Sequence, residues 1–491
     1  MQFRKLHLLR YGTQYKMAVN LNNDTVSILH SALREGMGPK YRRLARRLEA
    51  LILSRGLRTG EKLPAHRDLA ALLGVTAGTI SRAYGELRKI GLISSRVGDG
   101  TFVLELAKKK RKETDFKPYG GGEPGRYDLS RNTAIPGRML TSVSETLRRL
   151  ALQPEALEEL LQYGPELGLN RHRAAGARWL SNHHSDANAE QIVCVNGGQH
   201  GLFCVLMALL ERGDTLVSEQ FTYPGLISAC RILGINLVGL KMDDEGLIPK
   251  SLDAVCRTAT VRALFCTPTL QNPTTAVLGL ERRAEIARLC RAHNLLVIED
   301  DAHGVLVKDR HPHIGHFVPE RSILISSLSK AIAAGLRVGY VHAPLPLVGR
   351  IGTMVRTNCW MANPLAFEMV SLWIEDGSAL RFLEDQIEEI VRRKTLVQPL
   401  LDGFVVKTHP RSPHFWIEVP SPWRASEIAS ELRQKNCLVA PAEAFAVDRD
   451  RTVQFLRASV SSAEKTDAAI SEGFRILSAV LRNPSTTTAI H

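Results

Sequence analysis

The sequence predicts a two-part protein: a small, basic, mainly α-helical module, then a large α/β module built on a mostly parallel seven-stranded sheet. A smaller α+β part is expected at the C-terminal end. Three observations predict this arrangement. The net charge is confined to one end of the chain, amphipathic helical patterns fill that end, and seven strand-like runs alternate with helical patterns in the remainder. The length of 491 residues suits two to four domains at roughly 100–200 residues each.

The positive charge lies entirely in the first quarter of the chain. The whole sequence holds 64 Lys and Arg against 50 Asp and Glu, a net charge of +14. Residues 1–113 contain 23 basic and nine acidic residues, and residues 114–491 contain 41 of each. A charge needed only for solubility would be spread along the chain. The asymmetry therefore favours nucleic acid as the partner of the basic part, and an exposed basic face without a partner is the alternative.

Cysteine usage and hydropathy indicate the compartment. No C-x-x-C pair occurs, and several cysteines lie in apolar runs, so we expect buried, reduced thiols with neither a metal site nor a disulfide framework. No run approaches the ~20 apolar residues of a membrane span, and the start of the chain lacks the apolar core of a secretory signal. We expect a cytoplasmic protein. All eight cysteines lie in the neutral part: Cys194, Cys204, Cys230, Cys256, Cys266, Cys290, Cys359 and Cys437.

The first helix of the basic module is predicted over YRRLARRLEALILSRG, from Tyr41 onward. It is amphipathic, with arginines on the faces away from its apolar stripe. Residues 1–39 form an N-terminal extension in which NNDTVSILHSALREG predicts a further short helix without an assigned role. The apolar stripe of the first helix consists of Tyr41, Leu44, Leu48, Leu51 and Ile52.

Two short helices with a tight turn between them follow. HRDLAALLG ends at Gly74, and TAGTISRAYGELRKIG begins after Val75, which together predict a helix-turn-helix. In the second helix Ile80, Ala83, Leu87 and Ile90 can face a core. The outward positions belong to its N-terminal half, the part of a recognition helix that reaches base edges in the major groove. They are Thr76, Ala77, Thr79, Ser81 and Arg82.

The next segment, GLISSRVGDGTFVL, predicts a two-stranded hairpin, or wing, with Gly98, Asp99 and Gly100 at its turn. Arg96 would then lie beside a DNA phosphate. Any one of Arg67, Arg82 and Arg96 is by itself equally consistent with an ordinary solvated side chain. The three together, in a helix-turn-helix followed by a wing, indicate contact with DNA.

Residues 40–103 resemble the winged helix-turn-helix of the GntR family of bacterial regulators. The resemblance rests on LP-x-x-R-x-LA, the T-x-x-R-AY helix and the G-x-GTFV wing, in that order. It implies that this module, residues 40–103, binds a DNA operator. Residues 104–126 predict a basic linker with a reach of only ~25 Å, and its run Lys108–Lys112 either touches DNA phosphates or remains solvated.

From residue 127 the pattern becomes that of a parallel α/β sheet. The last hundred residues change character and predict a small α+β subdomain at about 390–480, followed by a tail at 481–491. The seven strand-like runs are QIVCVN, DTLVSEQ, NLVGLK, VRALFCTP, NLLVIEDD, RSILISSLS and RVGYVHAP, separated by segments long enough for crossovers.

Polar residues collect in the loops after these strands. They comprise a glycine turn that can present N–H groups to a phosphate, an aromatic ring, an amide, a carboxylate, an amine and a guanidinium. Pyridoxal phosphate requires such a set: a lysine for its Schiff base, an acid for the pyridine nitrogen and a phosphate clamp. The residues are Gly197, Gly198, Gln199, Tyr223, Asn272, Asp300, Asp301, Ser327, Lys330 and Arg337.

Most of these residues also admit a structural explanation. An aspartate can cap a helix, Tyr223 can pack, Asn272 can fix the turn before Pro273, and Arg337 can pair with a carboxylate. Lys330 is harder to explain in this way, because it follows a buried strand in an apolar stretch where an unpaired ammonium group would be costly.

Residues 127–480 resemble the fold-type-I pyridoxal phosphate aminotransferases. The resemblance rests on YGPELGLNRHRAAGARWL, NPTT, and S-x-S-K followed by GLR-x-GY. It implies that Lys330 forms the Schiff base, Asp300 pairs with the pyridine nitrogen and Asn272 bonds the phenolic oxygen. Tyr223 would stack on the ring, and the phosphate would be held by Gly198, Gln199, Ser327 and Arg337.

The same resemblance implies two further contacts. Tyr163 would reach the phosphate of the neighbouring subunit, which implies a homodimer, and Arg457 would bind the carboxylate of an incoming amino compound. His303 stands where the family usually has a tyrosine near the phenolic oxygen, so it is a further candidate for contact with the cofactor.

Together the two resemblances match the MocR subfamily of GntR regulators. The leading hypothesis is a transcription regulator that binds pyridoxal phosphate and responds to it or to an amine or amino acid. A metabolic aminotransferase with an appended DNA-binding domain is the alternative, and the sequence leaves open whether turnover is retained. A third possibility is a degenerate aminotransferase-like domain that serves only for dimerisation.

Overall fold

A computed structural model of the chain describes residues 23–34, 39–53, 56–58, 60–89, 92–96, 99–104, 127–135, 139–182, 187–421, 423–448, 454–461 and 466–484. The chain divides into two compact units, residues 1–115 and 116–491. The first unit is called the head below and the second the body.

The head is a winged helix-turn-helix, as predicted. α3 (His66–Leu73) ends at Gly74, whose φ of 63° gives the left-handed cap expected of a glycine, and α4 (Ala77–Lys89) follows. β2 (Ile93–Arg96) and β3 (Gly100–Val103) form the antiparallel wing, and β1 (Lys62–Leu63) adds a third strand in the order β1-β3-β2.

The core of the head contains one element whose role was not predicted. α1 (Asn23–Arg34) packs against α2 (Lys40–Leu53), and its Leu29 is fully buried beside the predicted stripe of α2. Tyr84 of α4 is also fully buried, and its hydroxyl donates to the carbonyl of Pro64 at 3.0 Å. Ile80, Ala83 and Leu87 face the core as expected, whereas Ile90 lies outside the described residues.

The body is organised around the predicted seven-stranded sheet, in the order β5-β13-β12-β11-β10-β6-β7. Only β13 runs antiparallel to its neighbours, so the prediction of a mostly parallel sheet is confirmed. The strands are β5 (Ile192–Val195), β6 (Thr215–Glu219), β7 (Asn236–Leu240), β10 (Ala263–Cys266), β11 (Leu296–Asp300), β12 (Ser322–Ser327) and β13 (Gly339–His342).

Alternate residues of these strands enter different cores, as the two-residue period of a strand requires. Phe265 and Ile298 pack on one face with α8 (Gly198–Leu209), α9 (Pro224–Leu233) and α12 (Leu345–Cys359). Leu264 and Val297 pack on the other face with α10 (Pro249–Cys256) and α11 (Leu280–Ala292). Because both faces are covered, the functional residues are left to the loops at the strand ends.

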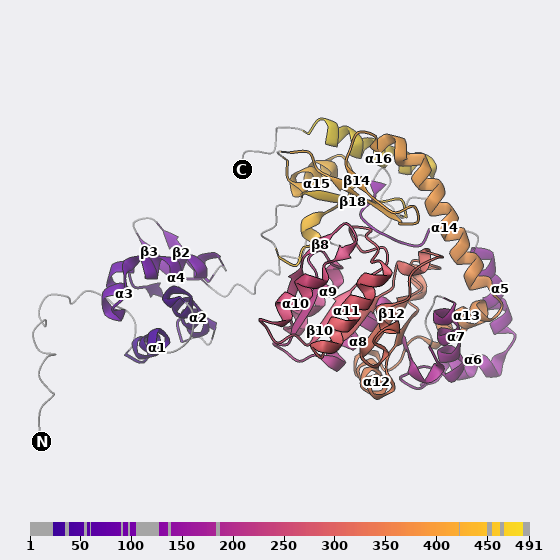
Figure 1. The fold of residues 1–491 in the computed structure, drawn as a ribbon, viewed down its shortest axis with the longest axis horizontal. Coiled ribbons are helices and arrows are strands. Elements are labelled where there is room, and N and C mark those ends of the chain that lie inside the picture. Colours follow the sequence, from indigo (N-terminus) through magenta and orange to yellow (C-terminus); the bar gives the residue numbers. More distant parts are fainter. Residues whose placement is uncertain are drawn as a thin grey trace, which may run out of the picture. The chain divides into compact units, whose positions relative to one another are not determined.

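The small subdomain combines the C-terminal segments with a piece from the start of the body. Its sheet has the order β14-β15-β18-β17, and β4 (Tyr127–Asp128) pairs in parallel with β16 (Cys437–Leu438). The long helix α14 (Ser378–Val397) leads into this part from the region of α5 and α13 (Figure 1). The other strands are β14 (Val406–Lys407), β15 (His414–Glu418), β17 (Ala440–Pro441) and β18 (Phe455–Ser459), flanked by α15 (Ala425–Gln434) and α16 (Asp467–Arg482).

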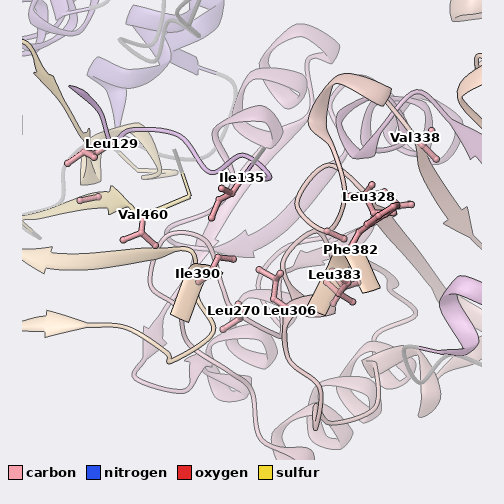
Figure 2. Packing of buried hydrophobic residues seen from close by; sticks show 14 of the residues in the cluster. Leu129, Ile135, Leu270, Leu306, Leu328, Val338, Phe382, Leu383, Ile390 and Val460 are labelled. Atoms are coloured by element: carbon pink, nitrogen blue, oxygen red, sulfur yellow. The ribbon is translucent and has the colours of Figure 1, made fainter. Parts of the chain in front are cut away.

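The remaining elements complete the body. Three helices, α5 (Met139–Ala151), α6 (Pro154–Leu161) and α7 (Asn170–Ser181), lie near α13 (Pro364–Glu375), and β8 (Met242–Asp243) forms a hairpin with β9 (Gly246–Leu247). The largest apolar cluster joins the small subdomain to the start of the body, where Leu129, Ile135, Ile390 and Val460 are all buried (Figure 2).

All eight cysteines are free thiols, but the expectation that they are buried is only partly met. Six are buried, Cys256 is half-buried, and Cys359 is exposed because it is the last residue of α12. Among the described residues, no helix is both long and apolar enough to cross a membrane.

Candidate cofactor site and nucleic-acid interface

The N-terminus of α8 and the loop after β12 bring several hydrogen-bond donors together. Gly197 has a φ of 82°, and a Cβ at this position would lie 2.6 Å from Nη2 of Arg337. Ser327 donates to the hydroxyl of Ser329 at 3.1 Å, and Arg337 lies 3.5 Å from the same oxygen. Backbone N–H groups of a helix start, two hydroxyls and a guanidinium are the donors that bind a phosphate.

Two further predicted residues meet at Gly225. A Cβ built there would lie 2.1 Å from Oε1 of Gln199 and 2.2 Å from Cε1 of Tyr223, so only a glycine permits both side chains to pack on this backbone. Tyr223 is half-buried at the start of α9. Burial, together with the charge of Asp300, raises the pKa of its hydroxyl. The structure thus brings an aromatic ring next to the start of α8.

Asp300 and Lys330 supply opposite charges to the same region. Burial raises the pKa of Asp300 to about 6 and Asp301 acts in the same direction, while the amide of Ala302, 3.0 Å from Oδ1, and the charge of Lys330 oppose this rise. Burial and the nearby Arg457 lower the pKa of Lys330 to about 8, against the effect of Asp300. A carboxyl and an amine with pKa values shifted toward neutrality are typical of a functional site.

Arg457 is the most deeply buried cation of the group, with 4% of its surface exposed in β18. Its Nη1 donates to Oδ1 of Asn272 at 2.7 Å, and its Nη2 donates to the carbonyl of Ser130. Its Nε is buried without a hydrogen-bond partner among the described residues, which leaves one donor free for a ligand. Burial lowers the pKa of Arg457 to about 10, so the side chain stays cationic at neutral pH.

His303 lies in a polar cluster that the sequence did not suggest. Its Nε2 is 3.2 Å from Nδ2 of Asn132, and the same amide nitrogen is 2.8 Å from Nδ1 of His414. His414 donates from Nε2 to the carbonyl of Pro273 at 3.1 Å. Burial lowers the pKa of His303 to about 3 and that of His414 well below its usual value, so both rings are neutral acceptors for Asn132.

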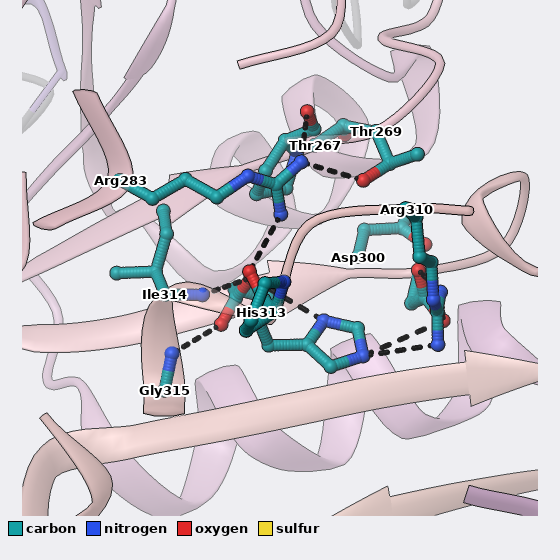
Figure 3. A network of polar contacts seen from close by, with 12 residues as sticks. Thr267, Thr269, Arg283, Asp300, Arg310, His313, Ile314 and Gly315 are labelled. Carbon is teal, nitrogen blue, oxygen red and sulfur yellow. Dashed lines mark hydrogen bonds and ion pairs between the residues drawn. The ribbon is translucent and has the colours of Figure 1, made fainter. Parts of the chain in front are cut away.

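A buried polar network supports the strand that carries Asp300 (Figure 3). Arg310 contacts both carboxylate oxygens of Asp301 at 2.7 Å, and its Nη2 is 3.2 Å from Nε2 of His313. Nδ1 of His313 lies 3.6 Å from Glu299, whose carboxylate also accepts from the amides of Ile314 and Gly315. The network anchors the residues on both sides of Asp300.

Tyr163 does not join this group within one chain. It is 81% exposed, and its ring lies 5.1 Å from that of Trp360, which is 53% exposed.

Most of the predicted DNA-contacting residues are at the surface of the head. Arg67, Thr76, Ser81 and Arg82 are exposed and Thr79 is half-buried. The hydroxyl of Thr76 accepts from the amide of Thr79 at 3.2 Å and so caps α4, which leaves it less free to read a base. Arg96 is in the wing strand β2, and its side chain lies outside the described residues.

The structure thus brings the strand-end residues together, whereas Asn132, His414 and Ser329 were missed. Ser329 is part of the S-x-S-K motif and could have been included. Asn132 and His414 carry no recognisable spacing, and only the fold places Asn132 beside Lys330 and His414 beside Asn132.

Residues 133–472 match the family of class I and II aminotransferases. The chain belongs to this aminotransferase family. Residues 40–103 match the bacterial regulatory proteins of the gntR family. The combination of a GntR-type domain with a class I and II aminotransferase domain is that of the MocR subfamily of transcription regulators.

Three transcription regulators are similar to this chain, and two of them match it over nine-tenths of its length. The HTH-type transcriptional regulator YdeF of Bacillus subtilis is 28% identical over 446 residues, which cover 90% of this chain and 94% of that protein. The HTH-type transcriptional regulator TauR of Rhodobacter capsulatus is 25% identical, covering 91% of this chain and 97% of its own. The HTH-type pyridoxine biosynthesis regulator PdxR of Corynebacterium glutamicum is 26% identical over 71% of this chain and 76% of its own.

Solved aminotransferases have the fold of the body. Kynurenine aminotransferase of Pyrococcus horikoshii, in complex with PMP, has a TM-score of 0.67 at 19% identity and covers 73% of this chain and 91% of that chain. The α-aminoadipate aminotransferase LysN of Thermus thermophilus, complexed with N-(5'-phosphopyridoxyl)-L-leucine, has a TM-score of 0.66 at 22% identity and covers 73% and 92%.

Proposed function

We propose that the chain is a transcription regulator that binds pyridoxal phosphate through a Schiff base at Lys330 and responds to the cofactor or to a captured amino compound. In this proposal residues 40–103 bind an operator, residues 104–126 link the modules and residues 127–480 hold the cofactor. The observation that supports it best is the convergence of a phosphate-type donor set, a half-buried carboxyl and an amine at Lys330.

The residues present fit the cofactor at each of its groups. Ser327, Gln199, Gly198 and Arg337 would hold the phosphate, and the absence of a side chain at Gly197 keeps the space between α8 and Arg337 open. Asp300, with its raised pKa, would gain a cationic partner in the pyridine nitrogen. When bound, pyridoxal phosphate supplies an aldehyde that reacts with amines and a ring that accepts electrons.

Arg457 would select the effector. Its free Nε and its burial favour an anionic group, so a carboxylated amine or amino acid fits better than a simple amine. Asn272 and Tyr223 would orient the ring, and His303 would occupy the position where the family usually has a tyrosine near the phenolic oxygen.

The deciding experiment measures operator binding with and without pyridoxal phosphate. The probe is a duplex that the wild-type protein selects from a random-sequence pool, titrated at fixed salt because affinity for DNA depends on it. The wild type is expected to change its affinity when the cofactor is added, and Lys330→Ala is not. Identical curves for both proteins in both conditions would refute the proposal.

A catalytic aminotransferase with an appended DNA-binding domain is the second candidate. It is favoured by the pKa of about 8 at Lys330, which leaves part of the amine unprotonated and reactive at neutral pH. Steady transamination between an amino acid and 2-oxoglutarate would support it. A domain used only for dimerisation predicts a purified protein without visible Schiff-base absorbance.

We also propose a homodimer in which Tyr163 of each chain reaches the phosphate site of the other. The exposed pair of Tyr163 and Trp360 supports such a contact, because large aromatic side chains are enriched at interfaces. Sedimentation of the wild type should give twice the chain mass, and a monomer at micromolar concentration would contradict this.

A further inference from the structure

The segment from Tyr127 to Ile135 is the first part of the body after the linker, and it lies between the cofactor lysine and the small subdomain. The amide of Leu129 donates to Leu438 at 2.9 Å, and the amide of Ser459 donates to the carbonyl of Leu129 at 2.8 Å. The amide of Thr133 donates to Ser461 at 2.7 Å. These bonds make the segment part of the small subdomain.

Two cations of the candidate site, Lys330 and Arg457, are bound to carbonyl groups of the same segment. Lys330 donates from Nζ to the carbonyl of Asn132, and Arg457 donates from Nη2 to the carbonyl of Ser130. Lys330 follows β12 of the large sheet, whereas Arg457 belongs to β18 of the small one. The segment is therefore held from both sides of the site.

The side chain of Asn132 fixes this carbonyl in place. Asn132 is 7% exposed, and its Nδ2 supplies both hydrogens to neutral acceptors, Nε2 of His303 and Nδ1 of His414. His414 is in turn held by the carbonyl of Pro273. Leu129 and Ile135 are buried in the core at either side, so movement is limited to the few residues between them (Figure 2).

This arrangement has a built-in cost. Oδ1 of Asn132 is buried without a hydrogen-bond partner among the described residues. An unsatisfied buried acceptor opposes the ordered state. The hydrogen bonds keep the segment ordered, but the unpaired acceptor lowers the stability of this ordered state. Loss of one further hydrogen bond should therefore be enough to increase the motion of the segment.

We propose that Asn132 is a positioning residue that holds the free amine of Lys330, and that segment 129–133 transmits the state of this amine toward the linker. The inference rests on the proposed function. When the amine condenses with an aldehyde, the oxygen of the aldehyde leaves as water together with two of the hydrogens on Nζ. The three freely rotating N–H donors of the ammonium group are thereby reduced to at most one, whose direction is fixed by the plane of the new C=N bond. The hydrogen bond from Nζ to the carbonyl of Asn132 is therefore weakened or lost, and the segment loosens.

The first test is hydrogen exchange of the full-length protein, with pyridoxal phosphate bound and after its removal with hydroxylamine. A hydrogen bond to a charged group is strong enough to change a local opening equilibrium by about tenfold. The amides of Leu129 and Thr133 should therefore exchange about tenfold faster in the loaded wild type than in the free one. In Lys330→Ala they should be fast in both conditions.

The second test uses variants of the segment. Asn132→Ala keeps the carbonyl but removes the side-chain bonds, so it should still form the Schiff base while its operator affinity no longer responds to pyridoxal phosphate. Asn236→Ala is the matched control, because it makes the same substitution outside the segment and outside the site. The side-chain amide of Asn236 donates to the hydroxyl of Thr215 at 3.1 Å, and the response of this variant should equal that of the wild type.

The outcomes separate the two proposals. Equal exchange of the segment in loaded and free wild type, with visible absorbance and a normal operator response, overturns the role of Asn132 and leaves the proposed function intact. A normal operator response in Asn132→Ala does the same. If no visible absorbance forms in the wild type, both proposals fail. The exchange measurement compares two states of the wild type. It therefore tests the role of Asn132 even if the Asn132→Ala variant does not fold.

Discussion

The ion pair between Arg310 and Asp301 lends itself to a quantitative test. Both side chains are nearly inaccessible, at 1% and 4% exposure, and the pair lies next to Asp300. Replacing Arg310 by Met keeps much of the side-chain volume but removes the guanidinium, leaving the Asp301 carboxylate buried without it. Removing one partner of a buried pair costs about 3–5 kcal/mol, and an m-value of about 3 kcal/mol/M converts this into a shift of roughly 1–1.7 M in urea.

Tryptophan fluorescence during urea unfolding is the suitable assay. All five tryptophans lie in the body, so the signal reports that unit alone. Adding Asp301→Asn to Arg310→Met removes the buried charge and should restore most of the lost stability. Arg291→Met is the matched control, because its pair with Glu320 is half-exposed on both sides and should contribute only about 0–1 kcal/mol.

The penalty should also depend on pH with a defined sign. In Arg310→Met the pKa of Asp301 rises above its value in the unfolded chain, because burial then acts without the guanidinium. Folding therefore takes up a proton as the pH falls through the new value, and the variant should recover stability relative to the wild type. A double variant no more stable than Arg310→Met, or a penalty independent of pH, would refute the electrostatic explanation.

Four further outcomes are expected. Arg82→Ala should weaken operator binding by about 1–3 kcal/mol and reduce sequence discrimination, and unchanged discrimination in competition assays would contradict the assignment of α4 as the recognition helix. Neutralising the Lys108–Lys112 run should mainly reduce the dependence of binding on salt concentration. Arg457→Ala should abolish the response to carboxylated effectors while retaining the cofactor's absorbance, and an unaltered titration would exclude this role. Because the pKa of Lys330 is about 8, the rate of Schiff-base formation should rise about tenfold per pH unit up to that value and then level off, so a flat stopped-flow profile would be inconsistent. Gly197→Ala should weaken binding of pyridoxal phosphate by tenfold or more, whereas Gly213→Ala, with a φ of 96° and open space around it, carries similar strain without the clash and should bind normally.

The sequence predicted the elements whose patterns are local. Both helices of the helix-turn-helix, the wing and all seven strands of the large sheet carry their own periodicity or glycine signals, and the structure places them as predicted. Most residues of the candidate cofactor site could be predicted for a related reason, because they lie at or just after the end of a strand whose position is fixed by the sheet.

Contacts between distant segments could not be predicted in this way. Asn132 meets His414 across 282 positions, and neither residue lies in a recognisable motif. The pairing of β4 with β16 depends on the return of the chain after more than three hundred residues. The burial of Tyr84 could not be predicted either, because its hydroxyl group suggests an exposed position. The side chain is fully buried because this hydroxyl donates a hydrogen bond to the carbonyl of Pro64.

The helix α1 has a practical consequence for dissecting the protein. The match to the gntR family begins at residue 40, but Leu29 of α1 lies at 0% exposure against the apolar side of α2. A fragment that begins at residue 40 would lack α1, so the apolar residues of α2 that pack against Leu29 would be exposed to solvent. An exposed apolar patch of this kind favours aggregation. An isolated DNA-binding fragment should therefore start before Asn23. Aggregation of a shorter fragment would be caused by the loss of α1 and not by an inability of residues 40–103 to fold.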